Sequence, residues 1–232
     1  MTVKPSSNGH PRTRVLDDEL RQTAHRIVAK YPNSRSATLP LLFLVQSVEG
    51  YVSTDGMREV AEILGITPAQ VLASGSFYSM LKKRPQGDYL ISVCRNISCT
   101  HNGARKVIAA LQERLGIEVG ETTPDGRFSL EAAECLATCD GAPSMQINYE
   151  DFYGVTPESA SEIVAKLERG DAVTSARNEP LKTSKEIARE TAIAGVVLPG
   201  TAGDEVARTV GGESQPADFS PGHRPRVEGP NG

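Results

Sequence analysis

Four cysteines are the residues of this chain whose type and spacing could carry chemistry. Cys94 and Cys99 form a Cys-x4-Cys pair, and Cys135 and Cys139 form a Cys-x3-Cys pair. Between the two pairs lie 35 residues, and the sequence holds no further cysteine. Thiolates ligate metals and react as nucleophiles, so the pattern predicts a metal site or a redox site.

Several kinds of site compete for this pattern. Four thiolates in two pairs meet the requirement of a [2Fe–2S] cluster, in which each iron takes two protein sulfurs. Structural zinc also takes four thiolates, but usually from tighter Cys-x2-Cys knuckles. Disulfides are typical of secreted proteins, which this chain does not resemble. A thioredoxin-type dithiol needs the spacing Cys-x2-Cys, which neither pair has. Inert buried thiols would not be expected to occur as two pairs. Spacing therefore favours the cluster and leaves zinc as the main alternative.

Composition restricts the functions that such a site could serve. The 232 residues carry a formal net charge of −4 with no cluster of Lys and Arg, which argues against a nucleic-acid partner. The polar N-terminus lacks a secretory signal, and the most apolar run, Leu39–Val45, is far shorter than the ~20 residues that span a bilayer. We therefore expect a soluble protein of a reducing compartment. No dinucleotide or phosphate-binding motif is evident, so we expect no catalytic residues in this chain.

Hydrophobic periodicity predicts a helical first region. A flexible N-terminus is expected over 1–14 and a helical bundle over 15–86, where apolar residues recur at helical spacing. Ser36 is expected to cap the second helix, and Thr67-Pro68 to start the fourth.

The pattern changes at residue 87 to that of an α/β domain, expected over 87–170. Tyr89–Val93 predicts a strand, followed by a helix, a second strand, short strands at Ser144–Asn148 and Phe152–Gly154, and a last helix that ends at Gly170. This order is typical of a thioredoxin-like layer. The expected fold class is therefore α+β.

The remainder, 171–232, predicts an extended or disordered tail. It holds six prolines and a single aromatic residue, Phe219, so it cannot build a core. Residues 183–197 have some helical periodicity but no core to pack on. We expect the tail to lie along partner subunits.

Three motifs carry a resemblance to a known family. They are Val93-Cys-Arg-Asn-Ile-Ser-Cys99, Thr122-Thr-Pro-Asp-Gly126, and the second cysteine loop with the Gly141-Ala-Pro143 that follows it. Over about 15–169, the chain resembles the thioredoxin-like [2Fe–2S] subunits, known as E subunits, of bacterial proton-pumping NADH–quinone oxidoreductase (respiratory complex I). Relatives also serve NAD-linked hydrogenases and formate dehydrogenases, which are the alternative.

The resemblance implies a site, partners and a location. By position, Cys94, Cys99, Cys135 and Cys139 match the cluster ligands of the family. The helical region would pack on a neighbouring subunit that holds FMN and binds NADH, and the cluster would exchange single electrons with that flavin. The protein would lie on the cytoplasmic side of the bacterial inner membrane, peripheral and held through the complex.

One departure from the family lies inside the second cysteine loop. The chain reads Leu136-Ala137-Thr138 where relatives commonly have Leu-Gly-Ala. Thr138 adds a hydroxyl next to the expected cluster, which leaves ligation intact but can change the potential. Among nearby charges, Arg95, Arg105 and Lys106 would raise the potential, whereas Glu134 and Asp140 would lower it.

Overall fold

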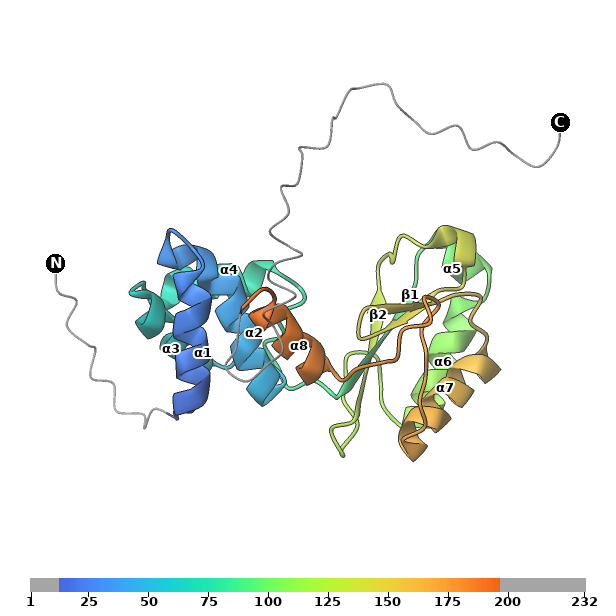
Figure 1. The fold of residues 1–232 in the computed structure, drawn as a ribbon. Coiled ribbons are helices and arrows are strands. Elements are labelled where there is room, and N and C mark those ends of the chain that lie inside the picture. Colours follow the sequence, from blue (N-terminus) through green and yellow to red (C-terminus); the bar gives the residue numbers. More distant parts are fainter. Residues whose placement is uncertain (1–12, 197–232) are drawn as a thin grey trace, which may run out of the picture. The chain divides into compact units, whose positions relative to one another are not determined.

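The computed structural model describes residues 13–196, which are coloured in Figure 1. The predictions made for residues 1–12 and 197–232 lie outside this range. The helices expected in the first region are present, and their apolar faces form a core that includes the fully buried Leu41, Leu42 and Leu44. These elements are α1 (Asp18–Ala29), the 3₁₀ turn η1 (Ser34–Ala37), α2 (Thr38–Glu49), α3 (Thr54–Leu64) and α4 (Pro68–Phe77).

Of the two helix starts predicted from the sequence, one is confirmed and one is wrong. Thr67 caps α4 and Pro68 lies in its first turn, as predicted, and Gln70 completes a capping box with Thr67. Ser36 does not cap the second helix, because it lies inside η1, whose cap is Asn33. Helix α2 follows η1 directly, and its N-cap position, Ala37, has no side chain that could accept a hydrogen bond.

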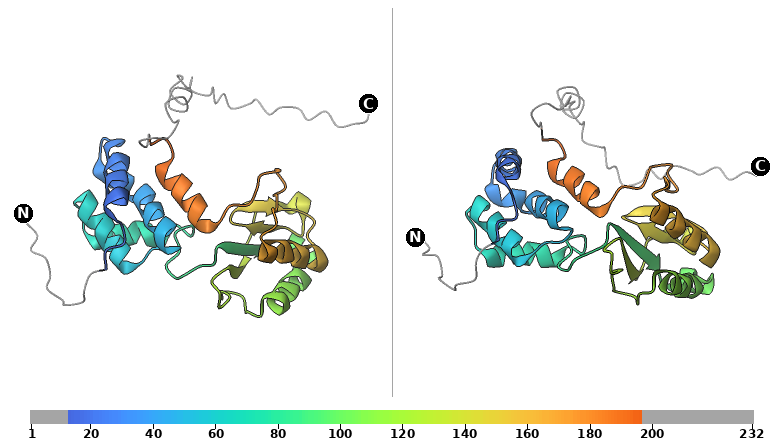
Figure 2. Two further views of the ribbon diagram at one scale, coloured as in Figure 1. Left: turned by 60° about the horizontal axis from the view of Figure 1, so that its bottom comes forward. Right: turned by 90° about the horizontal axis from the view of Figure 1, so that it is seen from below.

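A helix is present where the sequence predicts an extended tail. Helix α8 (Ser184–Ile193) starts with a capping box between Thr183 and Glu186 and packs against α2. Figures 1 and 2 draw the two helices side by side. The buried residues of α8 are the small Ala188 and Ala192. This segment needs no core of its own, because it shares the core of helices formed far earlier in the chain.

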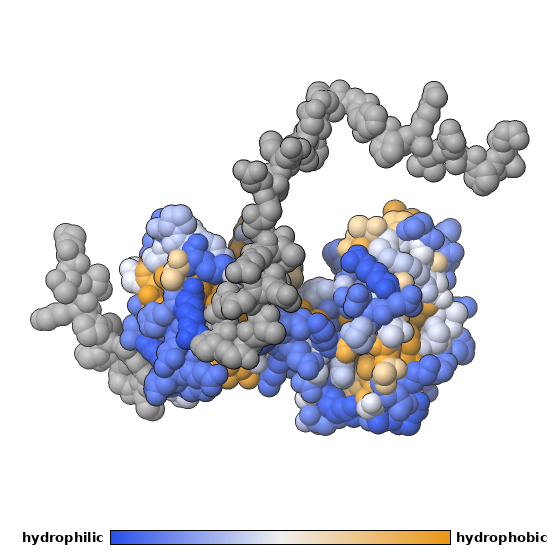
Figure 3. Space-filling view, viewed as in Figure 1, coloured by the Kyte–Doolittle hydropathy of each residue, from blue (hydrophilic) through white to orange (hydrophobic). Residues whose placement is uncertain are grey.

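No helix within residues 13–196 is long and apolar enough to cross a membrane. The longest of these helices, α7 (Pro157–Arg169), has 13 residues and a charged face. On the face seen in Figure 3, hydrophobic patches alternate with hydrophilic surface.

A four-stranded mixed sheet forms the centre of the α/β domain. The strand order is β2-β1-β3-β4; β1 pairs parallel with β2 and antiparallel with β3, which pairs antiparallel with β4. The expected short strands are present, although the last begins earlier than predicted. The strands are β1 (Tyr89–Cys94), β2 (Phe128–Ala133), β3 (Met145–Ile147) and β4 (Glu150–Phe152).

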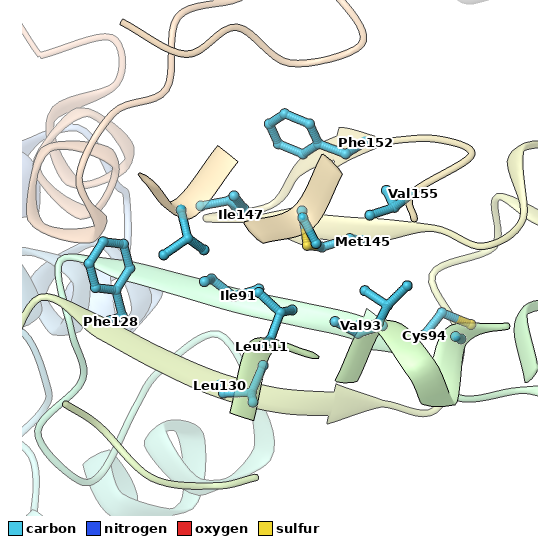
Figure 4. Close-up of a cluster of buried hydrophobic side chains, with 14 of the residues drawn as sticks. Ile91, Val93, Cys94, Leu111, Phe128, Leu130, Met145, Ile147, Phe152 and Val155 are labelled. Atoms are coloured by element: carbon cyan, nitrogen blue, oxygen red, sulfur yellow. The ribbon is translucent and has the colours of Figure 1, made fainter. Parts of the chain in front are cut away.

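Two helices cover one face of this sheet. Helices α6 (Ala104–Leu115) and α7 pack against each other and lie on the same side of the strands (Figures 1 and 2). Figure 4 shows the core between these layers, where Ile91 and Val93 of β1 lie among side chains from α6 and the neighbouring strands. Cys94 follows them at the end of β1. The apolar core therefore fixes the strand from which the first cysteine projects.

Asn148 joins three segments at the end of the sheet opposite Cys94. It is buried and has a left-handed backbone with φ 49°, which asparagine tolerates better than most residues. Its Oδ1 accepts the N–H of Leu90, and its Nδ2 donates to the carbonyls of Asp88 and Lys182, each at 2.8 Å. One side chain thereby connects β1, the turn after β3 and the segment that leads into α8.

Replacement of Asn148 by Asp tests this connection. The introduced carboxylate would face two carbonyl oxygens in place of donating to them, so Asn148→Asp should lower the free energy of unfolding by about 2–4 kcal/mol. Burial raises the pKa of such a carboxyl, so the deficit should shrink as the pH falls toward about 4. Urea unfolding at two pH values measures both effects.

The matched control is Asn178→Asp. Asn178 also has a left-handed backbone, with φ 61°, but its side chain is exposed. This change should alter stability by no more than about 0.5 kcal/mol. Equal losses in the two variants would contradict the role assigned to Asn148.

Candidate metal centre

Strand pairing brings both cysteine loops to one edge of the sheet. Cys94 ends β1 and lies beside Ala133, the last residue of the parallel strand β2. The chain continues from β1 to Cys99 in helix α5 (Ile97–His101), and from β2 to Cys135. Because parallel strands end at a common edge, both loops start there. Ser144, just before the antiparallel β3, reaches the same edge and accepts the N–H of Cys94 at 3.1 Å.

Cys94 and Cys99 are buried, and their side chains contact each other. Burial raises the pKa of the Cys94 thiol, although the N–H groups of Asn96 and Leu136 donate to its sulfur. Burial acts on Cys99 as well, but hydrogen bonds from the hydroxyl and N–H of Ser144 and from the Cys94 side chain together outweigh it and lower the pKa of that thiol. Cys99 Sγ lies 3.5 Å from Ser144 Oγ.

Ser144 was not among the sequence-predicted site residues. Its signal in the sequence is its place directly after Gly141-Ala-Pro143, where the chain leaves the second cysteine loop. Nothing in the sequence itself marks a serine at this position as a site residue. Only the strand pairing shows that its hydroxyl faces Cys99.

Cys135 and Cys139 are exposed. Cys135 Sγ accepts the backbone N–H of Ala137 at 3.4 Å, and Ala137 has a left-handed backbone with φ 59°. Cys139 begins the 3₁₀ turn η2 (Cys139–Gly141), in which the N–H of Gly141 donates to the carbonyl of Thr138 at 3.1 Å. The loop therefore directs a backbone donor toward a cysteine sulfur.

The two loops touch, but the four sulfurs are not gathered. The N–H of Leu136 donates to Cys94, and the carbonyl of Glu134 lies 4.0 Å from the same sulfur. The residues on both sides of Cys135 thus contact the first pair. Within residues 13–196, no group of three or more His, Cys, Asp and Glu side chains is close enough to hold a metal ion. The four-cysteine ligand set stays a prediction.

The chemistry of this edge nevertheless fits a [2Fe–2S] cluster. It offers two pairs of thiols, and backbone N–H groups already donate to Cys94 and Cys135, where they would offset the negative charge of bound thiolates. Thr138 Oγ1, between the second pair, is shielded from solvent without a hydrogen-bond partner in the described part of the chain. Such an orphaned group is uncommon and indicates a missing partner at this place.

The surface of this edge carries an ion pair and an exposed hydrophobic side chain. Arg95 and Glu134, which adjoin the first and second pair, form an ion pair across the loops. Their opposite effects on the potential, expected from the sequence, therefore largely cancel. Ile97 of α5 is 81% exposed, and Figure 3 shows hydrophobic surface at this end of the domain.

Comparison with known proteins identifies the family. The sequence profile of the thioredoxin-like [2Fe–2S] ferredoxins matches residues 24–168. The chain belongs to this family. The four-stranded sheet with its cysteine loops is the ferredoxin domain, and helices α1 to α4 precede it.

Relatives of this ferredoxin are named as subunits of NADH-quinone oxidoreductase. Over 78% of its length and 73% of the relative's, it is 41% identical to the E subunit of NADH-quinone oxidoreductase from Mycobacterium tuberculosis. It is 38% identical to NADH-quinone oxidoreductase subunit 2 of Thermus thermophilus, over 66% of this chain and 86% of that one.

A solved structure shares the fold. A chain of a crystal structure described as an air-oxidized NAD⁺-reducing [NiFe]-hydrogenase matches 59% of this ferredoxin and 24% of that chain, with a TM-score of 0.50. Sequence identity there is 20%, so the likeness concerns the fold alone.

The left-handed Ala137 generates a prediction. A Cβ disfavours this backbone region by roughly 1–2 kcal/mol, whereas glycine enters it freely. Ala137→Gly should therefore keep the hydrogen bond to Cys135 and raise the free energy of unfolding by up to about 1 kcal/mol, after the extra flexibility of the unfolded chain is counted. Ala137→Val should lower it, because a β-branched residue fits this region poorly. Urea unfolding ranks the three proteins, and a Gly variant less stable than the wild type would contradict the assignment.

Proposed function

We propose that this chain is the electron-transfer subunit of the NADH-oxidising module of a proton-pumping NADH–quinone oxidoreductase. Cys94, Cys99, Cys135 and Cys139 hold one [2Fe–2S] cluster. The cluster exchanges single electrons with FMN in a neighbouring subunit, which also binds NADH. The chain itself contributes no substrate site, and the complex keeps it peripheral on the cytoplasmic side of the membrane.

The similarity to the E subunits of this oxidoreductase carries the proposal. It extends over 78% of the chain, so it includes the helical part as well as the ferredoxin domain. The placement of both cysteine loops at one sheet edge supports the ligand assignment, since two loops can then offer two thiolates each.

When bound, a [2Fe–2S] cluster supplies one-electron chemistry, because its two irons share a single added electron. The residues of this chain provide the surroundings. Backbone N–H groups of Leu136 and Ala137, together with Ser144, donate to cysteine sulfurs and compensate added negative charge. The ferredoxin core behind β1 holds the first pair away from water, whereas the second pair lies at the surface from which a partner could exchange electrons.

A second candidate is the equivalent subunit of an NAD-linked hydrogenase or formate dehydrogenase. The cysteine motifs of this chain also resemble those of the subunits in these enzymes, and spacing does not separate the two candidates. A zinc-stabilised interaction module is the remaining alternative, because zinc also accepts four thiolates.

The cofactor is tested on the purified full-length chain. We expect a reddish-brown protein with about two irons and two acid-labile sulfides, and a [2Fe–2S] EPR signal after reduction. Cys135→Ala should abolish or strongly weaken that signal, whereas Ser98→Ala, in the first cysteine loop, should retain it. A colourless protein with one zinc and no sulfide would establish the zinc alternative, and full cluster retention in Cys135→Ala would remove that ligand.

The complex is tested by isolation of the chain with its native partners. Affinity purification from cells that express a tagged copy at the natural level should recover an FMN-containing, NADH-oxidising subunit together with quinone-reducing membrane subunits. In that preparation NADH should reduce the cluster, as seen by its EPR signal. Recovery of hydrogenase or formate dehydrogenase subunits would favour the second candidate.

A further inference from the structure

One hydroxyl at the cysteine edge lacks a partner. Thr138 Oγ1 is shielded from solvent although the residue as a whole is half-buried, so the hydroxyl is turned inward. Within residues 13–196, only Glu49 Oε2, in the helical part, is another buried side-chain oxygen or nitrogen with no hydrogen bond. Buried hydroxyls are almost always bonded, so this group calls for an acceptor or donor that the described residues do not supply.

Thr138 adjoins two of the predicted cluster ligands in the second cysteine loop. Thr138 lies between Cys135 and Cys139, and the loop backbone around it is already bonded: Ala137 donates to Cys135 Sγ, and Gly141 donates to the Thr138 carbonyl. The Thr138 hydroxyl has no such bond. A threonine hydroxyl can rotate its hydrogen toward any nearby acceptor.

We propose that the Thr138 hydroxyl donates a hydrogen bond to a sulfur of the [2Fe–2S] cluster and thereby favours its reduced form. This inference rests on the proposed function. Reduction adds one electron and one negative charge, from an external reductant, and breaks no bond. A donor at sulfur stabilises the more negative state more strongly, so Thr138 raises the reduction potential.

Two other hydroxyls at this edge serve as comparisons. Ser144 Oγ lies 3.5 Å from Cys99 Sγ and already acts on a predicted ligand. Thr100, next to Cys99, donates instead to the carbonyl of Arg95 at 2.7 Å and has no proton left for a sulfur. Removal of the hydroxyl should therefore change the potential at Thr138 and Ser144 but not at Thr100.

The test is an EPR-monitored redox titration of the full-length protein with its cluster. Thr138→Val keeps the shape of the side chain and removes the donor. It should lower the midpoint potential by up to about 59 mV. For a one-electron reduction, this shift corresponds to a tenfold change in the equilibrium constant. Thr138→Ser should restore most of the wild-type value, and Ser144→Ala should shift it in the same direction as Thr138→Val. Thr100→Val should stay at the wild-type value.

A second measurement separates a hydrogen bond from a general change in the loop. After exchange into D₂O, deuterium couplings to the reduced cluster should include one that is present in the wild type and Thr138→Ser and absent in Thr138→Val. If Thr138→Val does not assemble a cluster, Thr138→Ala takes its place in both experiments.

The outcomes distinguish this inference from the function on which it rests. An intact [2Fe–2S] signal with an unchanged midpoint and unchanged deuterium couplings in the Val or Ala variant would overturn the role of Thr138 and leave the function standing. Equal midpoints in Thr138→Ala and Thr138→Ser would overturn it as well. Absence of a [2Fe–2S] signal in the wild type would instead remove the proposed function, and the inference with it.

Discussion

The parallel pairing of β1 with β2 is the constraint on which the rest of the ferredoxin domain depends. Because the two strands run in one direction, both cysteine loops leave the same edge of the sheet, although 35 residues separate the pairs in sequence. Antiparallel β3 brings Ser144 to that edge as well. A shift of the register by one residue would turn Cys94 to the other face of the sheet, and the buried Ile91 and Val93 oppose such a shift.

Around this edge, backbone N–H groups and one hydroxyl donate to the cysteine sulfurs. Leu136 and Ala137 donate through their N–H groups, and Ser144 donates through both its hydroxyl and its N–H. Arg95 and Glu134 form an ion pair across the loops, so their opposite charges offset each other. Fixed neutral donors suit a one-electron site, since they stabilise added charge without a proton transfer. The arrangement of hydrogen-bond donors around the sulfurs therefore depends on the turn geometry of the loops more than on the surface charge of the domain.

The C-terminal segment shows how a sequence poor in apolar residues can still be part of a folded domain. Within the described residues, its path is held by Asn148, which donates to the carbonyl of Lys182, and it includes helix α8, whose buried residues are alanines. Small side chains allow close approach of α8 to α2, so the segment adds packing without large hydrophobic residues. The cost of ordering it is offset by contacts with helices that have already folded.

The sequence by itself determined the family, because the number and spacing of the cysteines and the motifs that flank them are local properties. It also determined the order and type of most elements: Thr67 with Gln70 caps α4, and Gly170 ends α7, through interactions a few residues apart. Only the tertiary structure decided which residues contact the cysteines and which helices pack together. Ser144 reaches Cys99 through strand pairing, α8 finds its core on α2, and the Thr138 hydroxyl is buried by the fold of its loop. These contacts join residues far apart in the chain, or depend on which way a side chain turns, and neither periodicity nor spacing carries that information.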